Sequence, residues 1–107
     1  MNTNTRVTYL RNDRGFPVGC IVMRYNKTTG FLEYQLTTHN PNDEFDRRQG
    51  RQLALGRLAE TPIELRIGKD PTMHQMSITV MRDIVLVGDA PARAVKAAAS
   101  WLAKNDR

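Results

Sequence analysis

The segment FPVGCIVMRYNKTTGFLEYQLT, residues 16–37, decides the fold class. It joins two largely apolar stretches, residues 16–25 and 31–37, through the turn-forming sequence Asn26-Lys27-Thr28-Thr29-Gly30. The second stretch partly alternates apolar and polar residues, as a half-buried strand does. Upstream, residues 6–10 resemble another strand, and the turn-rich Asn12-Asp13-Arg14-Gly15 separates them from the first stretch. We therefore predict three antiparallel strands.

A helix is predicted to follow these strands. Asn40-Pro41-Asn42 interrupts the strand pattern, because the residue before a proline avoids helical geometry and an Asn can cap the next helix. Good helix formers continue from Arg47 to Ala59, and Thr61-Pro62 ends the run. The side predicted to pack on the sheet comprises Phe45, Gln49, Gln52, Gly56 and Ala59. Gly50 and Gly56 suggest close approach of the helix backbone to the sheet.

The second half of the chain gives three further strands and a helix. Residues 63–67, 73–80 and 84–87 have short apolar or alternating patterns, with a turn at residues 68–71. Asp89 can cap a helix from Ala90 or Pro91 to about Lys104. We predict an α+β fold in the order βββα-βββα, with one antiparallel sheet covered by two helices. The candidate core residues are Phe16, Val18, Cys20, Val22, Leu53, Ile78, Val80, Val85 and Trp101.

Length and composition indicate one soluble domain, residues 1–107. The chain is 40% hydrophobic and 25% charged, as ordinary globular proteins are. No apolar run approaches the roughly 20 residues that span a bilayer, and the N-terminus lacks the layout of a signal peptide. The single cysteine, Cys20, lies in an apolar run and fits a reducing compartment. A cytoplasmic location without membrane association is expected.

The net charge of +5 makes a polyanionic partner plausible, although such a charge can also serve solubility alone. The excess lies at the two ends of the chain. Residues 1–38 hold five bases and two acids, and residues 89–107 hold four bases and two acids. Several of the early bases, such as Arg11 and Arg14, fall near predicted hairpin ends, where Tyr9, Tyr25 and Tyr34 could offer stacking surfaces.

Residues for catalysis or metal binding are not apparent. Cys20, His39 and His74 are far apart and lack the spacing of metal ligands. Phosphate-binding glycine motifs are absent from the sequence, and each acidic residue suits a turn or a helix start. A nucleophilic pair of Cys20 with a histidine would require an exposed thiol. We expect a non-enzymatic protein without a cofactor or metal.

Arginines cluster in the first predicted helix. Arg47 and Arg51 lie one turn apart, and Arg57 lies on an adjacent face, so the three could contact phosphates. Alternatively, the acids of the same helix could pair with them and leave an ordinary solvated surface. Arg93, Lys96 and Lys104 form a second basic face on the last predicted helix, for which a solvated surface is the simpler interpretation.

The stretch from Asn40 to Leu58 resembles a segment of small bacteriophage-encoded proteins of unknown function. The shared pattern is N-P-x-D-x-F followed by G-R-x-x-A-x-G-R-L, and it covers about 19 of 107 residues. The resemblance implies a phage accessory protein in the cytoplasm of an infected bacterium. It implies no catalytic residues.

The sequence favours a nucleic-acid-associated function. In this hypothesis Arg47, Arg51 and Arg57, helped by Arg93 and Lys96, contact the phosphates of DNA or RNA without reading bases. The alternative is a protein that inhibits a host enzyme or an antiphage defence complex by binding it, which needs only a shaped surface. Neither interpretation specifies an oligomeric state.

Overall fold

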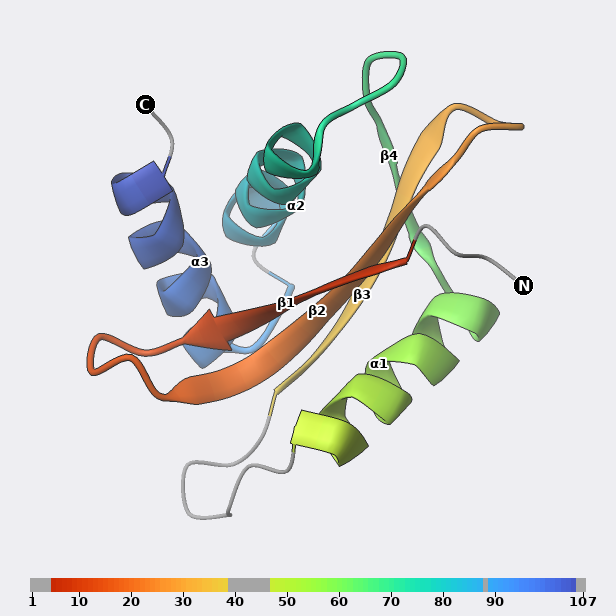
Figure 1. Cartoon of the computed structure of the whole chain (residues 1–107). Helices are drawn as coiled ribbons and strands as arrows, with labels where there is room; N and C mark the ends of the chain where they lie inside the picture. The colour runs from red at the N-terminus through yellow and green to blue at the C-terminus, as the bar shows by residue number, and fades with distance from the viewer. Residues whose placement is uncertain (1–4, 39–46, 88, 106–107) are drawn as a thin grey trace.

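A four-stranded antiparallel sheet forms the centre of the molecule (Figure 1). The computed structural model describes residues 5–38, 47–87 and 89–105, without the side chain of Arg47. The strands are β1 (Arg6–Arg11), β2 (Pro17–Asn26), β3 (Phe31–Thr38) and β4 (Ile63–Arg66), and they lie side by side in chain order. The predicted three-strand meander is therefore confirmed, and the strand predicted at residues 63–67 becomes the fourth.

Three helices cover the sheet, on both of its faces (Figure 1). Helix α1 (Arg47–Glu60) packs on β2 and β3 from one side. Helices α2 (Met73–Val87) and α3 (Ala92–Asn105) pack against each other on the opposite side, where α3 also contacts β1 and β2. The α+β class is confirmed, whereas the predicted order βββα-βββα and the cover of two helices are wrong. The observed order is βββα-βαα.

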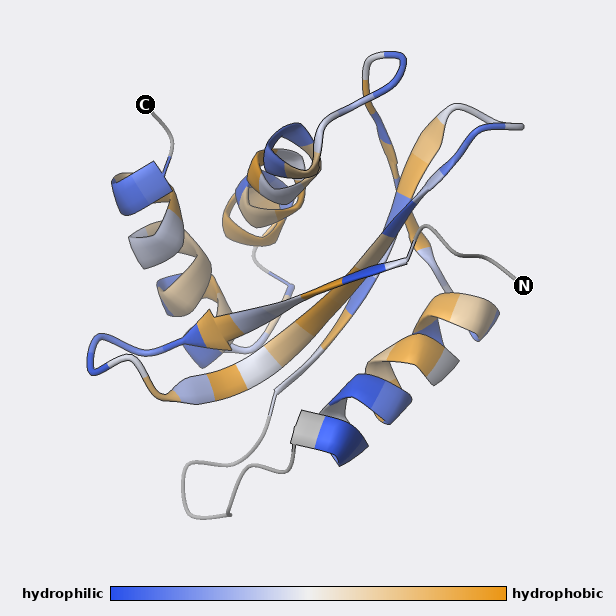
Figure 2. Ribbon diagram, in the orientation of Figure 1, coloured by the Kyte–Doolittle hydropathy of each residue, from blue (hydrophilic) through white to orange (hydrophobic). Residues whose placement is uncertain are grey.

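The central strand explains the continuous apolar run in the sequence. Alternate residues of a strand point to opposite faces, and both faces of β2 are covered. Ile21 and Met23 belong to the core under α2 and α3, whereas Cys20 and Val22 pack with Ala54 and Leu58 of α1. Figure 2 shows hydrophobic residues along the central strands and a hydrophilic N-terminal end of α1.

The strands predicted at residues 73–80 and 84–87 are wrong, because this stretch forms α2. Its buried residues Met76, Ser77, Val80, Met81 and Ile84 recur at helical spacing. Thr72 and Gln75 hold the start of the helix by reciprocal hydrogen bonds. The Thr72 N–H donates to Gln75 Oε1 at 2.8 Å, and the Gln75 N–H donates to Thr72 Oγ1 at 3.1 Å. Tertiary burial of this face outweighs the β propensity of its valines and isoleucines.

Helix α1 is rotated relative to the prediction. Gly50, Ala54 and Leu58 are buried against the sheet, whereas Gln49, Gln52, Gly56 and Ala59 are exposed. Phe45 and the predicted helix start at residues 40–42 lie outside the described residues. The helix ends at Glu60, as predicted, and the Thr61 N–H donates to the Arg57 carbonyl at 2.8 Å.

The glycine that requires close backbone approach is Gly19 on β2. A Cβ at this position would lie 2.4 Å from the Thr37 carbonyl oxygen, so any side chain there forces β2 and β3 apart. Gly50 is buried, and its carbonyl accepts a hydrogen bond from Thr37 Oγ1 at 3.1 Å. Gly56, in contrast, faces open space.

The predicted core is confirmed in its centre and wrong at two positions. Cys20, Val22 and Val80 are fully buried, and Val18, Val85 and Trp101 pack partly buried against the main core. Ile78 is half-buried and belongs to neither core cluster. Phe16 and Leu53 are exposed, at 62% and 53% of their surface. Phe16 sits beside the β1–β2 turn and Leu53 on a flank of α1, which the strand and helix patterns did not reveal.

Candidate nucleic-acid interface

The five predicted binding residues lie on two opposite faces of the sheet. Arg47, Arg51 and Arg57 belong to α1, while Arg93 and Lys96 belong to α3 on the other side (Figure 1). The side chain of Arg47 is outside the described part of the structure. One surface that uses all five residues is therefore not formed.

Arg57 is a structural residue of the sheet edge. Its Nη1 donates to the Leu36 carbonyl at 3.0 Å, and the Leu36 N–H donates to Gln35 Oε1 at 3.3 Å. Strand β4 pairs with β3 only as far as Tyr34, so Leu36 lies beyond the last pair of this ladder. Buried backbone groups require hydrogen-bond partners, and these two side chains supply them beyond Ile63, the first residue of β4.

Arg51 is exposed on the other flank of α1. Six positions separate it from Arg57, which corresponds to roughly 120° around a helix of 3.6 residues per turn. The two guanidinium groups therefore point in divergent directions. Burial raises the pKa of the Cys20 thiol, and the positive charge of Arg51 partly opposes this effect.

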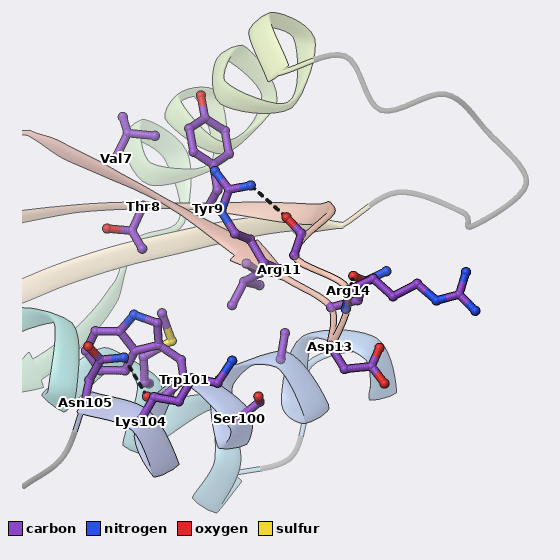
Figure 3. A pocket seen from close by; sticks show the side chains of 15 residues that line it. Val7, Thr8, Tyr9, Arg11, Asp13, Arg14, Ser100, Trp101, Lys104 and Asn105 are labelled. Atoms are coloured by element: carbon purple, nitrogen blue, oxygen red, sulfur yellow. Dashed lines mark hydrogen bonds between the residues drawn. The ribbon is translucent and has the colours of Figure 1, made fainter.

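Arg93 and Lys96 instead line a groove between α3 and the β1–β2 hairpin. Two adjoining pockets of about 660 and 240 Å³ share Arg11, Asn12, Asp13, Ala97 and Ser100. We call their combined surface the basic groove. Its charged lining residues are Arg11, Asp13, Arg14, Arg93, Lys96 and Lys104. In Figure 3, Ser100, Trp101 and Lys104 of α3 lie across from β1 and the hairpin.

Side-chain and backbone hydrogen bonds fix the hairpin that forms one wall of the groove. Asn12 Oδ1 accepts the N–H groups of Arg14 and Phe16, both at 3.0 Å. Gly15 adopts φ 85°, a left-handed conformation that glycine tolerates best. Arg11 Nη1 donates to the Gly15 carbonyl at 3.0 Å, which holds its guanidinium at the turn. Arg14 extends outward from the tip (Figure 3).

The other wall is one stripe of α3. Arg93, Lys96, Ser100 and Lys104 recur at intervals of three or four residues, so they share a side of the helix. Ala94, Ala97 and Ala98 are buried beneath this helix, and their small side chains allow it to lie close to the rest of the core. The helix therefore presents its basic stripe toward the hairpin, with Lys96 exposed and with Arg93 and Ser100 half-buried in the lining of the groove.

The groove concentrates positive charge. Its lining contains five bases and one acid, which gives a formal local charge of +4 from the difference of those two counts. The whole chain carries +5. The sequence placed these bases near a hairpin and on a helix face, but it carried no signal that joins the two, because about 80 residues separate them.

Cys20 and His74 lie apart from each other, and His39 lies outside the described residues. Cys20 is buried on the α1 side of the sheet, whereas His74 is exposed on α2 and its ring lies 6.3 Å from that of Trp101. These two residues therefore do not form a nucleophilic pair. In the described ranges, no three His, Cys, Asp or Glu side chains gather closely enough to hold a metal ion.

Among the helices that the structure describes, none has the length and apolar character to cross a membrane. Comparisons of the chain with protein-family models, with curated proteins and with solved structures return no match. The geometry and charge of the groove are thus the basis for assigning a function.

Proposed function

We propose that the protein binds nucleic acid through the basic groove, by contacts to phosphates rather than by reading bases. The observation that carries this proposal is that five basic residues, from the hairpin and α3, line one open groove with a single acid. Arginine and lysine at such a surface bind phosphate oxygens and release counterions from the polyanion. The proposal keeps Arg93 and Lys96 from the sequence hypothesis and moves the site away from α1.

The accessibility of the groove suits an extended polyanion. Strand β1 is the edge strand of the sheet, so among the described elements no further strand covers its outer side. The hydrogen-bonded turn at Asn12–Gly15 holds Arg11 before any ligand arrives, which reduces the entropy that binding must remove. Ser100, Asn12 and Asn105 add neutral hydrogen-bonding groups along the same lining.

A salt-dependent binding titration tests the proposal. Labelled single-stranded and double-stranded DNA and RNA are titrated by fluorescence anisotropy at about 50 and 200 mM salt. Arg93→Ala with Lys96→Ala should weaken binding about tenfold, since exposed ion pairs contribute up to about 1 kcal/mol each. The slope of log K against log salt should also shrink by roughly 0.7–0.9 per lost phosphate contact.

The matched control is Arg66→Ala with Lys69→Ala. These two exposed bases lie on β4 and in the loop after it, outside the lining of the groove, and their removal changes the net charge by the same amount. The control should retain affinity and slope. Equal losses of affinity in both double variants would indicate diffuse attraction to a basic protein. A loss of affinity in Arg51→Ala and in neither double variant would return the site to α1.

A further inference from the structure

A second hollow lies at the β4 side of the sheet, away from the basic groove. It has a volume of about 530 Å³ and is formed by β3, β4, the C-terminal end of α2 and residues 89–91 before α3. Ile63, Leu65, Ile84 and Val87 give it an apolar lining. We call this surface the apolar hollow.

Large apolar side chains are exposed at this surface. Val87 is 56% exposed and Ile63 is 36% exposed, and both line the hollow. Scattered single exposures are normal in proteins, but apolar residues grouped around a hollow mark an interaction surface. The described part of the chain leaves these side chains in contact with solvent.

The charge around the apolar hollow is opposite to that of the rest of the molecule. Its lining holds Glu64, Asp83 and Asp89 against the single base Arg57, whose Nη1 already donates to the Leu36 carbonyl. The last turn of α2 has no basic residue, so the partial negative charge of the helix C-terminus adds to the carboxylates. The net charge of the chain is +5, so this negative region is a local feature.

We propose that the apolar hollow docks a basic amphipathic segment of a partner protein. Such a segment would place its apolar side chains against Ile63 and Val87, and its Lys or Arg side chains beside Glu64 and Asp89. The carboxylates disfavour nucleic acid at this place. They also disfavour a symmetric dimer, because two copies docked through the same hollow would bring like charges together. The proposal does not depend on nucleic-acid binding in the basic groove.

Two synthetic helical peptides with the same leucine face test the docking. One carries lysines on its polar face and the other carries glutamates. The Leu/Lys peptide should bind the full chain saturably in a fluorescence anisotropy titration, more tightly than the Leu/Glu peptide and more weakly at high salt. Ile63→Ser with Val87→Ser should reduce its affinity at least about tenfold, because central apolar contacts dominate such interfaces.

Two controls separate docking from unspecific attraction. Phe16→Ser removes another large exposed apolar side chain, beside the β1–β2 turn and outside the lining of the apolar hollow, and should leave peptide affinity unchanged. Glu64→Gln, at an exposed position, should weaken the Leu/Lys peptide without altering the fold, as checked by circular dichroism. Oligonucleotide titration of the same variants reports on the basic groove separately.

The proposal is overturned by any of three results. The first is absence of saturable Leu/Lys binding, and the second is equal binding of the Leu/Glu peptide. The third is a dimer of the wild-type chain, seen by sedimentation velocity, that Ile63→Ser with Val87→Ser dissociates. That last result would assign the apolar hollow to a second copy of the chain.

Discussion

Tyr34 connects the sheet to α2 through one partly buried hydrogen bond. Its hydroxyl donates to Asp83 Oδ2 at 2.7 Å, and the residue is only 3% exposed. Burial is the main cause that raises the pKa of this phenol, and the hydrogen bond to Asp83 and the charge of Asp83 add to it. The folded protein thus favours the protonated phenol more strongly than the unfolded chain does.

The direction of this shift predicts a loss of stability at alkaline pH. A pKa raised by folding contributes stability that is complete below the unfolded value of 10.0 and is lost as pH rises above it. Urea unfolding from pH 7 to 11 should show a decline above about pH 10 that is smaller in Tyr34→Phe. At pH 7 this variant should be about 1–3 kcal/mol less stable, because Asp83 loses its donor.

Tyr25→Phe is the matched control for this substitution. Tyr25 packs half-buried against the same core, and its replacement removes one hydroxyl without removing the donor to Asp83. It should retain the alkaline decline of the wild type. If Tyr34→Phe retains the whole decline as well, Tyr34 is not its source.

Arg57 illustrates what the sequence alone does not show about individual side chains. Its guanidinium group and its place in the arginine cluster of the helix suit a phosphate contact, and the sequence hypothesis used it in this way. The Leu36 carbonyl that it binds lies 21 residues earlier in the chain, on a strand edge that β4 leaves uncovered. Its structural role depends on which residue of β3 is the last to pair with β4, and a local sequence pattern does not show that residue.

At the scale of elements, the sequence predicted the strands of the meander, β4 and α3, and it failed at α2. The stretch Ser77-Ile78-Thr79-Val80 and the later Ile84-Val85-Leu86-Val87 are rich in β-branched residues, which favour strands. The signal for a helix was the capping-box pattern Thr72-x-x-Gln75 directly before the apolar run. The error affected the site as well, because α2 fixes the position of α3 beside the hairpin.

The capping box predicts a measurable coupling. Thr72→Ala and Gln75→Ala should each destabilise the protein by about 1 kcal/mol in urea unfolding, since each removes partners of the first backbone N–H groups of α2. The double variant should lose less than the sum of the single losses, because each side chain bonds to the other residue's backbone. Gln52→Ala, exposed on α1, should change stability by less than about 0.5 kcal/mol.

Strict additivity of the Thr72 and Gln75 substitutions would contradict a reciprocal cap. It would mean that each residue contributes to the start of α2 independently.

At the scale of the whole molecule, the two faces of the sheet differ in how much core they support. Beneath α2 and α3 the main cluster contains thirteen buried residues of the described chain, whereas the cluster beneath α1 contains four. Much of the hydrophobic stabilisation therefore lies on the side that also builds the basic groove. Length and composition predicted one core. In the structure the sheet separates the core into two clusters of unequal size.

This asymmetry predicts that α1 opens more readily than the rest of the fold. Native-state hydrogen exchange should give lower opening free energies for the amides of α1 than for those of β2 and α2. Leu58→Ala, in the smaller cluster, should lower protection in α1 by about 2–5 kcal/mol up to the limit of its opening free energy. Ile84→Ala, in the main cluster, should lower protection in the sheet and all three helices together, because it destabilises the global fold.

Equal protection of α1 and α2, with equal responses to both substitutions, would show that the faces unfold as one unit. Separate opening of α1 matters for function, because the basic groove would then keep its geometry while α1 is open. Leu58→Ala should in that case bind oligonucleotides with the affinity of the wild type, and Ile84→Ala should bind them more weakly.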